Sequence, residues 1–213
     1  MSTKERLRLH VVRQFHDPTG PGGHVAGWIM GRRPSNVARN RWAIDLLEVQ
    51  PRDRVLELGC GPGVAVRAAA ARATEGLVLG VDGSAVMVSQ ARRRNAGAVR
   101  DGRVRLVHAR VEELPALTSA VPDEPFDAVL AVNNVGFWPD PSRRLSEVRE
   151  LVRLGGRIAL VTQPRCPGAT AATSASAGDD LAELLTGAGF GDLTVHLLPL
   201  DPPAVCVLAA NSA

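Results

Sequence analysis

The feature that most constrains the fold is a short apolar segment that ends in a glycine-rich turn. Residues 54–59 read RVLELG, and the turn continues as Cys60-Gly61-Pro62-Gly63 into the helix-forming residues 62–73. Glycine adopts backbone conformations that other residues avoid, and it lets a ligand approach the main chain closely. Proline is tolerated near the start of a helix. The segment therefore predicts a buried strand, a ligand-binding turn and a helix.

The same alternation of short apolar runs and longer helical patterns continues along the chain. This order is typical of a parallel sheet covered by helices. Only residues 198–202 separate the last two runs, which is too short for a parallel crossover and predicts an antiparallel hairpin. We therefore expect an α/β fold with helices on both faces of a mostly parallel sheet and one antiparallel C-terminal strand. The seven predicted strands are 54–59, 76–82, 103–108, 126–133, 156–163, 191–197 and 203–209.

The chain of 213 residues is predicted to form a single domain, residues 1–213. Residues 1–50 are expected to form an N-terminal arm and helix that cover the ligand and acceptor pocket. A helix is predicted over residues 145–152, where Leu and Val recur at helical spacing before a Gly-Gly pair at 155–156. Residues 164–178 are small and polar, which indicates a flexible loop or lid.

Composition argues against several functions. The formal net charge is +3, and 24 of the 25 basic residues are arginines spread along the whole chain. With no Tyr, four Phe and three Trp, aromatic side chains for base stacking are scarce, so a nucleic-acid partner is not expected. Three isolated cysteines lack the spacing of a zinc site, so no metal is predicted. The chain has no membrane-length apolar run and no apolar signal region, which favours a cytoplasmic location.

Two ligand classes compete for the glycine-rich turn. The dinucleotide fingerprint is G-x-G-x-x-G, whereas the spacing here is G-x-G-x-G with Val64 at the sixth position. S-adenosylmethionine (SAM) carries no phosphate but has an ammonium and a sulfonium, and Glu57 places an acid near that cationic end. Asp82 ends the second strand, where a carboxylate can accept both hydroxyls of a ribose, in SAM and NAD alike. These residues favour SAM, with an NAD(P)-dependent Rossmann oxidoreductase as the alternative.

Taken together, the segments resemble the class I SAM-dependent methyltransferases over residues 40–210. The resemblance implies a Rossmann-like, seven-stranded, mostly parallel sheet with an antiparallel C-terminal strand. It also implies SAM as the cofactor, S-adenosylhomocysteine (SAH) as its product, and methyl transfer by in-line displacement. The segments that carry it are VLELGCGPG (55–63), GVDGSAVMV (80–88), RVRLVHARVEELP (103–115), FDAVLAVNNVGFWPD (126–140) and LVRLGGRIALV (151–161).

By this resemblance, Met87 would pack on the adenine, and the main-chain carbonyl of Asn133 would accept a hydrogen bond from the SAM ammonium. Many relatives read the adenine amino group with an acid where this chain has Arg110. A guanidinium cannot accept a hydrogen bond, so main-chain groups of Arg110 and Val111, or the side chain of Glu112, would replace it. The residues that the resemblance places around the cofactor are Glu57, Gly59, Cys60, Gly61, Gly63, Asp82, Gly83, Ser84, Met87, Arg110, Val111 and Asn133.

The acceptor side is defined by fewer residues. The resemblance implies that Asn134, Phe137 and Trp138 face the acceptor or cover the cofactor, and we expect Trp28 of the N-terminal arm to line the acceptor pocket. Residues 201–203 read Asp-Pro-Pro, similar to a motif of base-modifying methyltransferases, but they fall in the final hairpin and are interpreted as a turn. A small-molecule acceptor is therefore favoured.

Methyl transfer requires alignment of acceptor and donor rather than a dedicated catalytic residue. If the acceptor is a hydroxyl, a base helps to remove its proton, and His16 and His24 are the candidates. The remaining alternative is a non-catalytic SAM-binding protein that serves as an interaction module.

Overall fold

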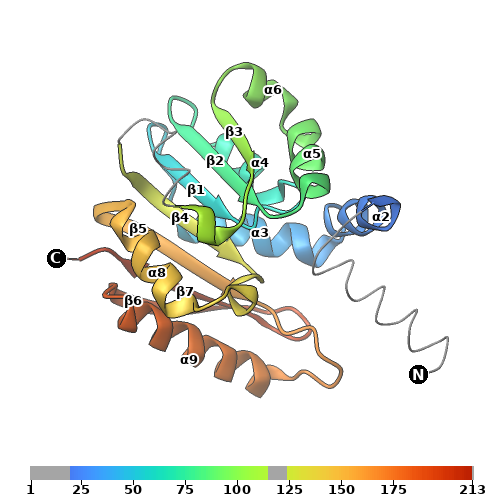
Figure 1. Cartoon of the computed structure of the whole chain (residues 1–213). Helices are drawn as coiled ribbons and strands as arrows, with labels where there is room; N and C mark the ends of the chain where they lie inside the picture. Colours follow the sequence, from blue (N-terminus) through green and yellow to red (C-terminus); the bar gives the residue numbers. More distant parts are fainter. Residues whose placement is uncertain (1–19, 115–123, 213) are drawn as a thin grey trace.

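The computed structural model describes residues 20–114 and 124–212. Within them the strands form one seven-stranded sheet in the order β3-β2-β1-β4-β5-β7-β6 (Figure 1). The first five strands of this order, β3, β2, β1, β4 and β5, pair in parallel, and β7 is antiparallel to both of its neighbours. The predicted fold class is confirmed. The strands are β1 (Arg54–Leu58), β2 (Leu77–Asp82), β3 (Val104–His108), β4 (Phe126–Val132), β5 (Val152–Thr162), β6 (Gly191–Leu198) and β7 (Ala204–Ala210).

Helices cover both faces of the sheet (Figure 1). Helices α8 and α9 pack on one face around a core that includes Leu145 and Leu185. On the other face, α3, α4 and α5 pack around a core that includes Ile44 and Val66. The helices are α2 (Gly20–Met30), α3 (Pro34–Leu46), α4 (Val64–Ala70), α5 (Ala85–Arg94), α6 (Ala96–Arg100), α8 (Pro141–Glu150) and α9 (Ala171–Gly187), with short 3-10 helices η1 (Val111–Glu113) and η2 (Val135–Phe137).

The first two described helices lie on the α4 and α5 side of the molecule. α2 packs on α5, and α3 packs on α4 and on the sheet. Ile44 of α3 is 1% exposed, and the partly buried Trp42 packs against the same core. None of the described helices is long and apolar enough to cross a membrane.

Strand β1 positions the functional site. Its residues from Val55 to Leu58 are buried, as a strand in the middle of a covered parallel sheet requires. Leu58 pairs with Val81 of β2 and with Ala131 of β4. Parallel neighbours bring their carboxyl ends to one edge of the sheet, so the turns after β1, β2 and β4 meet there.

The last strand of the chain does not lie at the edge of the sheet. β7 is inserted between β5 and β6, which leaves β6 as the edge strand. Ala204 to Val207 of β7 are fully buried, whereas Val195 and Leu197 of β6 are exposed. The short hairpin connection fixes the antiparallel direction, and the apolar run of β7 fits the more buried of the two positions.

The helix predicted over residues 145–152 is wrong at its end. α8 stops at Glu150, and Val152 is already the first residue of β5. The carbonyl of Leu151 accepts a hydrogen bond from the N–H of Phe126 at 2.8 Å, and that of Val152 accepts one from Asn211 Nδ2 at 2.7 Å. These long-range bonds draw the segment into the sheet, and local spacing does not encode them.

The flexible loop predicted over residues 164–178 is also wrong in its second half, because α9 begins at Ala171. Thr170 caps the helix reciprocally with Thr173: each hydroxyl oxygen accepts the other residue's main-chain N–H. Ser174 is fully buried, and a Cβ on Gly178 would lie 2.9 Å from a methyl carbon of Val205 in β7. The small residues therefore allow close packing of a helix on the sheet rather than flexibility.

The cap of α9 gives a stability prediction. Replacing Thr170 with alanine removes the acceptor of the Thr173 N–H and should lower the free energy of unfolding by about 1 kcal/mol. Thr186→Ala, at an exposed position in the last turn of the same helix, is the matched control and should change it by less than about 0.5 kcal/mol. Urea unfolding measures both, and equal effects of the two substitutions would contradict the capping role.

Candidate functional site

The turn after β1 depends on glycine at three positions. Gly59, Gly61 and Gly63 have φ angles of +65°, +50° and +74°, in the left-handed region that favours glycine. A Cβ on Gly59 would lie 2.1 Å from Asn134 Nδ2, and one on Gly63 would lie 2.7 Å from Asn95 Nδ2. A Cβ on Gly61 would meet nothing within 4 Å. Gly59 and Gly63 thus allow the turn to fit its neighbours, whereas Gly61 faces open space.

Asp82, at the end of β2, ties this turn to the next one. Its Oδ2 accepts the N–H of Gly61 at 2.7 Å, and its Oδ1 accepts the N–H of Ser84 at 2.8 Å. Ser84 is buried, and its hydroxyl caps α5 by accepting the N–H of Met87. The carboxylate is therefore held between the two turns at the carboxyl edge of the sheet, and a carboxylate oxygen can accept more than one hydrogen bond.

Glu57 is an acid inside β1. It is 3% exposed, and its Oε2 is buried without a hydrogen-bond partner in the described structure. Burial raises the pKa of Glu57 well above its usual value, and the charge of Asp82 raises it further, while the N–H of Val66 opposes the shift. A buried carboxyl with an unpartnered oxygen beside the glycine-rich turn is suited to a cationic ligand group.

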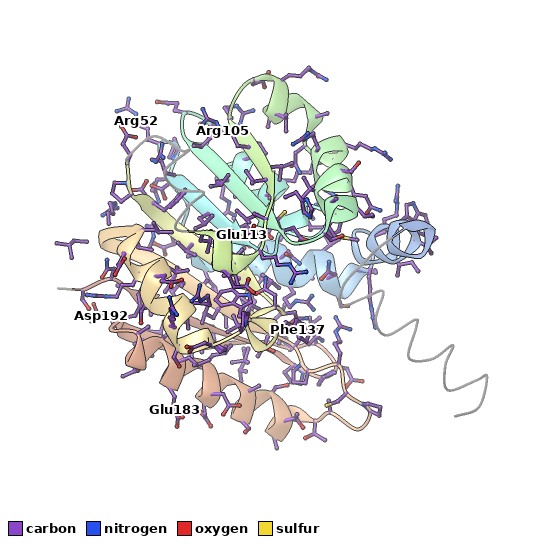
Figure 2. All side chains as sticks on the ribbon, in the orientation of Figure 1. Arg52, Arg105, Glu113, Phe137, Glu183 and Asp192 are labelled. Atoms are coloured by element: carbon purple, nitrogen blue, oxygen red, sulfur yellow. The ribbon has the colours of Figure 1, made fainter. Side chains whose placement is uncertain are left out.

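The raised pKa of Glu57 gives a prediction on pH. The unfolded chain ionises Glu57 at about pH 4.3, whereas the folded chain binds that proton to higher pH, so this residue costs stability as pH rises above about 4. Glu57→Gln should therefore be more stable than wild type above that pH, with a difference that vanishes in acid. Thermal melts across pH measure the difference, with the exposed Glu183→Gln as control (Figure 2). Parallel curves for wild type and Glu57→Gln would contradict it.

Two asparagines follow β4 at the same edge. Asn133 has a positive φ of 55°, and its Oδ1 accepts the N–H of Gln163, the residue after β5, at 2.7 Å. Asn134 donates from Nδ2 to the carbonyl of Leu58 and so ties the β4 turn to β1. The Oδ1 of Asn134 is buried and has no hydrogen-bond partner in the described structure. The pair therefore connects the ends of three neighbouring strands.

Residues predicted around an adenine lie along the β2 and β3 turns. Met87 is 2% exposed, and its methyl group would lie 2.5 Å from a Cβ on Gly27, so α2 packs directly over it. Arg110 is exposed, and its main-chain N–H donates to Glu113 Oε2 at 2.6 Å. Val111 is half-buried against the core. The structure brings Gly83 and Arg110 together, since a Cβ on Gly83 would lie 3.5 Å from Arg110 Cγ.

Three residues expected at the site point elsewhere or lie apart. Cys60 is 4% exposed in the core, so only its main chain is available to a ligand at the turn. Trp138 is 9% exposed and packs in the opposite core, whereas Phe137 is exposed on η2 (Figure 2). Trp28 is exposed on α2 with the Arg32 guanidinium 4.6 Å from its ring, in a surface groove rather than beside the asparagines.

The two histidines proposed as bases cannot be placed at the site. His16 lies outside the described residues. His24 lies in α2, but its side chain is not among those that the structure describes. The base therefore stays a sequence prediction.

Asn95 and Arg94, which sequence reasoning did not single out, also hold the turn. Asn95 is 5% exposed and donates from Nδ2 to the carbonyl of Gly63 at 3.2 Å. Arg94 donates from Nε to the carbonyl of Pro62 at 2.8 Å. Both residues end α5, and nothing in the local sequence marks a contact with a turn about thirty residues earlier.

Comparisons with known proteins agree with this geometry. A family model described as a methyltransferase domain matches residues 55–156. The uncharacterized methyltransferase YdaC of Bacillus subtilis (strain 168) is 30% identical over 190 residues, which cover 89% of this chain and 99% of that protein. The 27-O-demethylrifamycin SV methyltransferase of Amycolatopsis mediterranei (strain S699) is 34% identical over 116 residues, 54% of this chain and 40% of that protein. The chain thus matches less than half of this second relative.

Solved structures share the fold. A SAM-dependent methyltransferase from Aquifex aeolicus superimposes with a TM-score of 0.65 at 17% identity, over 83% of this chain and 92% of that chain. At this identity the likeness is one of architecture.

Proposed function

The chain belongs to the class I SAM-dependent methyltransferases, and from this premise we propose that it transfers a methyl group from SAM to a small-molecule acceptor by in-line displacement. The observation that carries the assignment of the site is the Asp82 carboxylate. It is fixed by the N–H groups of Gly61 and Ser84 at the edge where the β1 and β2 turns meet.

The residues present fit SAM. The space above Gly61 accommodates a ligand against the main chain, and Asp82 offers a carboxylate to ribose hydroxyls. The buried Oε2 of Glu57, which has no hydrogen-bond partner among the described residues, can accept a hydrogen bond from the ammonium of SAM. The Gly61 N–H already donates to the Asp82 carboxylate, so it is not available to the pyrophosphate of a dinucleotide.

In this proposal the chain mainly binds and orients. SAM supplies a methyl group that is already activated on its sulfonium. The Asp82 carboxylate accepts hydrogen bonds from the ribose hydroxyls. The main chain from Gly59 to Gly63 lies along the methionine part of SAM, and the carbonyl of Asn133 accepts a hydrogen bond from its ammonium. Gly83, Ser84 and Met87 belong to the adenosine side, with the main chain of Arg110 and Val111. Alignment of the acceptor with the methyl group then accounts for most of the rate.

Two observations support a small molecule as the acceptor. The residues after β4 read Asn133-Asn134-Val135-Gly136 rather than the Asn/Asp-Pro-Pro-aromatic motif of enzymes that modify nucleobase amino groups. The Amycolatopsis relative, by its name, acts on 27-O-demethylrifamycin SV. Asn134 and the exposed Phe137 then border the acceptor.

The experiment that tests this uses SAM with a radiolabelled methyl group. The full chain is incubated with a cell extract separated into metabolites, nucleic acids and proteins. Label should appear in the metabolite fraction only, and heat-inactivated chain provides the background. Label in the RNA or protein fraction would overturn the small-molecule acceptor, and no label in any fraction would favour a non-catalytic interaction module.

A further inference from the structure

A cluster of polar side chains continues from Asn133 along the carboxyl edge of the sheet. Gln163, directly after β5, is 2% exposed, and its N–H donates to Asn133 Oδ1 at 2.7 Å. Its side-chain N–H donates to the carbonyl of Pro202 at 2.7 Å, which fixes the orientation of the amide. The side-chain oxygen of Gln163, Oε1, accepts hydrogen bonds from two guanidinium groups.

These guanidiniums come from distant parts of the chain. Arg39 of α3 donates from Nη1 to Gln163 Oε1 at 2.6 Å, and Arg165 donates from Nη2 to the same oxygen at 2.8 Å. Arg39 is 3% exposed, and its Nε is buried without a hydrogen-bond partner in the described structure. The positive charge of a third arginine, Arg33, contributes to lowering the pKa of both Arg39 and Arg165.

The cluster has positive charge and, in the part of the chain that the structure describes, no counter-ion. The ion pairs found among residues 20–114 and 124–212 use other arginines, and none involves Arg33, Arg39 or Arg165. Burial, with smaller contributions from Arg165 and Arg33, lowers the pKa of Arg39 to about 10, so it stays cationic at neutral pH. Arg39 also donates from Nη2 to Asn36 Oδ1, so both of its acceptors are neutral amide oxygens. A buried cation with only neutral partners is unfavourable unless an anion completes the site.

The cluster also lies at the same edge of the sheet as the proposed cofactor site, near Asn134, which the proposal places beside the acceptor. Gln163 contacts Asn133, and the neighbouring Asn134 contacts the β1 turn at Leu58. β1, β4 and β5 are adjacent parallel strands, so the cluster is displaced from the glycine-rich turn in the direction of β5, away from β2 and Asp82.

We propose that the methyl acceptor carries an oxyanion, a carboxylate or a phosphate, which binds Arg39 and Arg165, with Arg33 adding attraction at the same place. This inference rests on the proposed function, since it assigns the cluster to the acceptor. The planar guanidinium fork suits two-oxygen anions of this kind. The unpartnered Nε of the buried Arg39 provides a donor that no described group of the chain satisfies.

The test measures binding of simple anions to the full chain in the presence of SAH. Inorganic phosphate and benzoate are titrated calorimetrically at constant ionic strength, with benzamide as the uncharged match to benzoate. Phosphate or benzoate should bind and benzamide should not, and the anion that binds identifies the group. Absence of binding by both anions would overturn the proposal.

Variants locate the site. Arg165→Gln, at an exposed position, should weaken anion binding at least about tenfold. Arg105→Gln, on the outer strand β3 far along the sheet, is the matched control and should leave it unchanged (Figure 2). Equal anion affinity in Arg165→Gln and wild type would contradict the assignment.

Gln163→Glu separates ligand binding from a purely structural role. The new carboxylate would replace the amide oxygen between Arg39 and Arg165 and act as an internal counter-ion. It should weaken anion binding at least about tenfold, although it gives up the hydrogen bond from the amide to the carbonyl of Pro202. A folded variant with unchanged anion affinity would show that the cluster only supports the fold. Separate SAH titrations of every variant should match wild type, and failure of wild type to bind SAH would count against the cofactor site alone.

Discussion

Replacement of Gly61 with arginine is expected to lower the affinity of the chain for SAH by at least about 1,000-fold, equivalent to about 4 kcal/mol of binding free energy. A side chain at this position points into open space, with nothing of the protein within 4 Å. That space is where the proposal places the cofactor against the main chain. Isothermal titration with SAH measures the effect.

The matched control for Gly61→Arg is Gly102→Arg. Gly102 also has a positive φ, of 76°, and a Cβ there also meets nothing within 4 Å, but it lies in the turn before β3 at the opposite edge of the sheet. Both substitutions introduce similar backbone strain, of about 1 to 3 kcal/mol, so their thermal stabilities should fall together. SAH affinity should fall in Gly61→Arg only. Comparable losses of affinity in both variants would point to strain rather than to a blocked site.

Replacement of Asp82 with alanine should reduce SAH affinity by about 100-fold or more, because each hydrogen bond to a charged group contributes about 1.5 to 3 kcal/mol. The substitution removes the proposed acceptor of the ribose hydroxyls. It also frees the N–H groups of Gly61 and Ser84, so the two turns lose their common anchor. Titration of SAH into the folded variant gives the loss directly.

Asp127→Ala is the control for Asp82→Ala, because it also removes a carboxylate that accepts a main-chain hydrogen bond. Asp127 Oδ2 accepts the N–H of Arg54 at 2.7 Å, and its Oδ1 pairs with Arg153, at the amino edge of the sheet. This variant should lose a similar amount of stability, about 1 to 3 kcal/mol, and keep wild-type SAH affinity. If Asp82→Ala binds SAH as tightly as Asp127→Ala does, the ribose does not bind at Asp82 and the prediction is contradicted.

The parts of the molecule that sequence predicts are those that local pattern encodes. The seven strands are visible as apolar runs, and the last hairpin is antiparallel because its connection is too short for a crossover. The glycine-rich turn and Asp82 meet because parallel strands align their carboxyl ends. The end of α8 and the start of α9 were mispredicted since bonds from Asn211 to Val152, and close packing of Gly178 on Val205, come from distant residues.

The arginine cluster, where we propose that the acceptor binds, shows the same limit of local sequence patterns. Arg39 and Gln163 are 124 positions apart, and no spacing rule joins them. One signal was available: Gln163 directly follows an apolar strand at the same edge as Gly59 and Asp82, where polar side chains face ligands. For Trp138, sequence reasoning named a residue that does not border the site. A large aromatic after β4 was expected beside the acceptor, and it packs in the core instead.

The most direct test of the central claim is a crystal structure of the full chain with SAH. The ribose hydroxyls should lie within hydrogen-bond distance of the Asp82 carboxylate, the amino-acid part should lie over Gly61, and its ammonium should face the carbonyl of Asn133. Binding of SAH at any other part of the molecule, with no ligand between the β1 and β2 turns, would contradict the account.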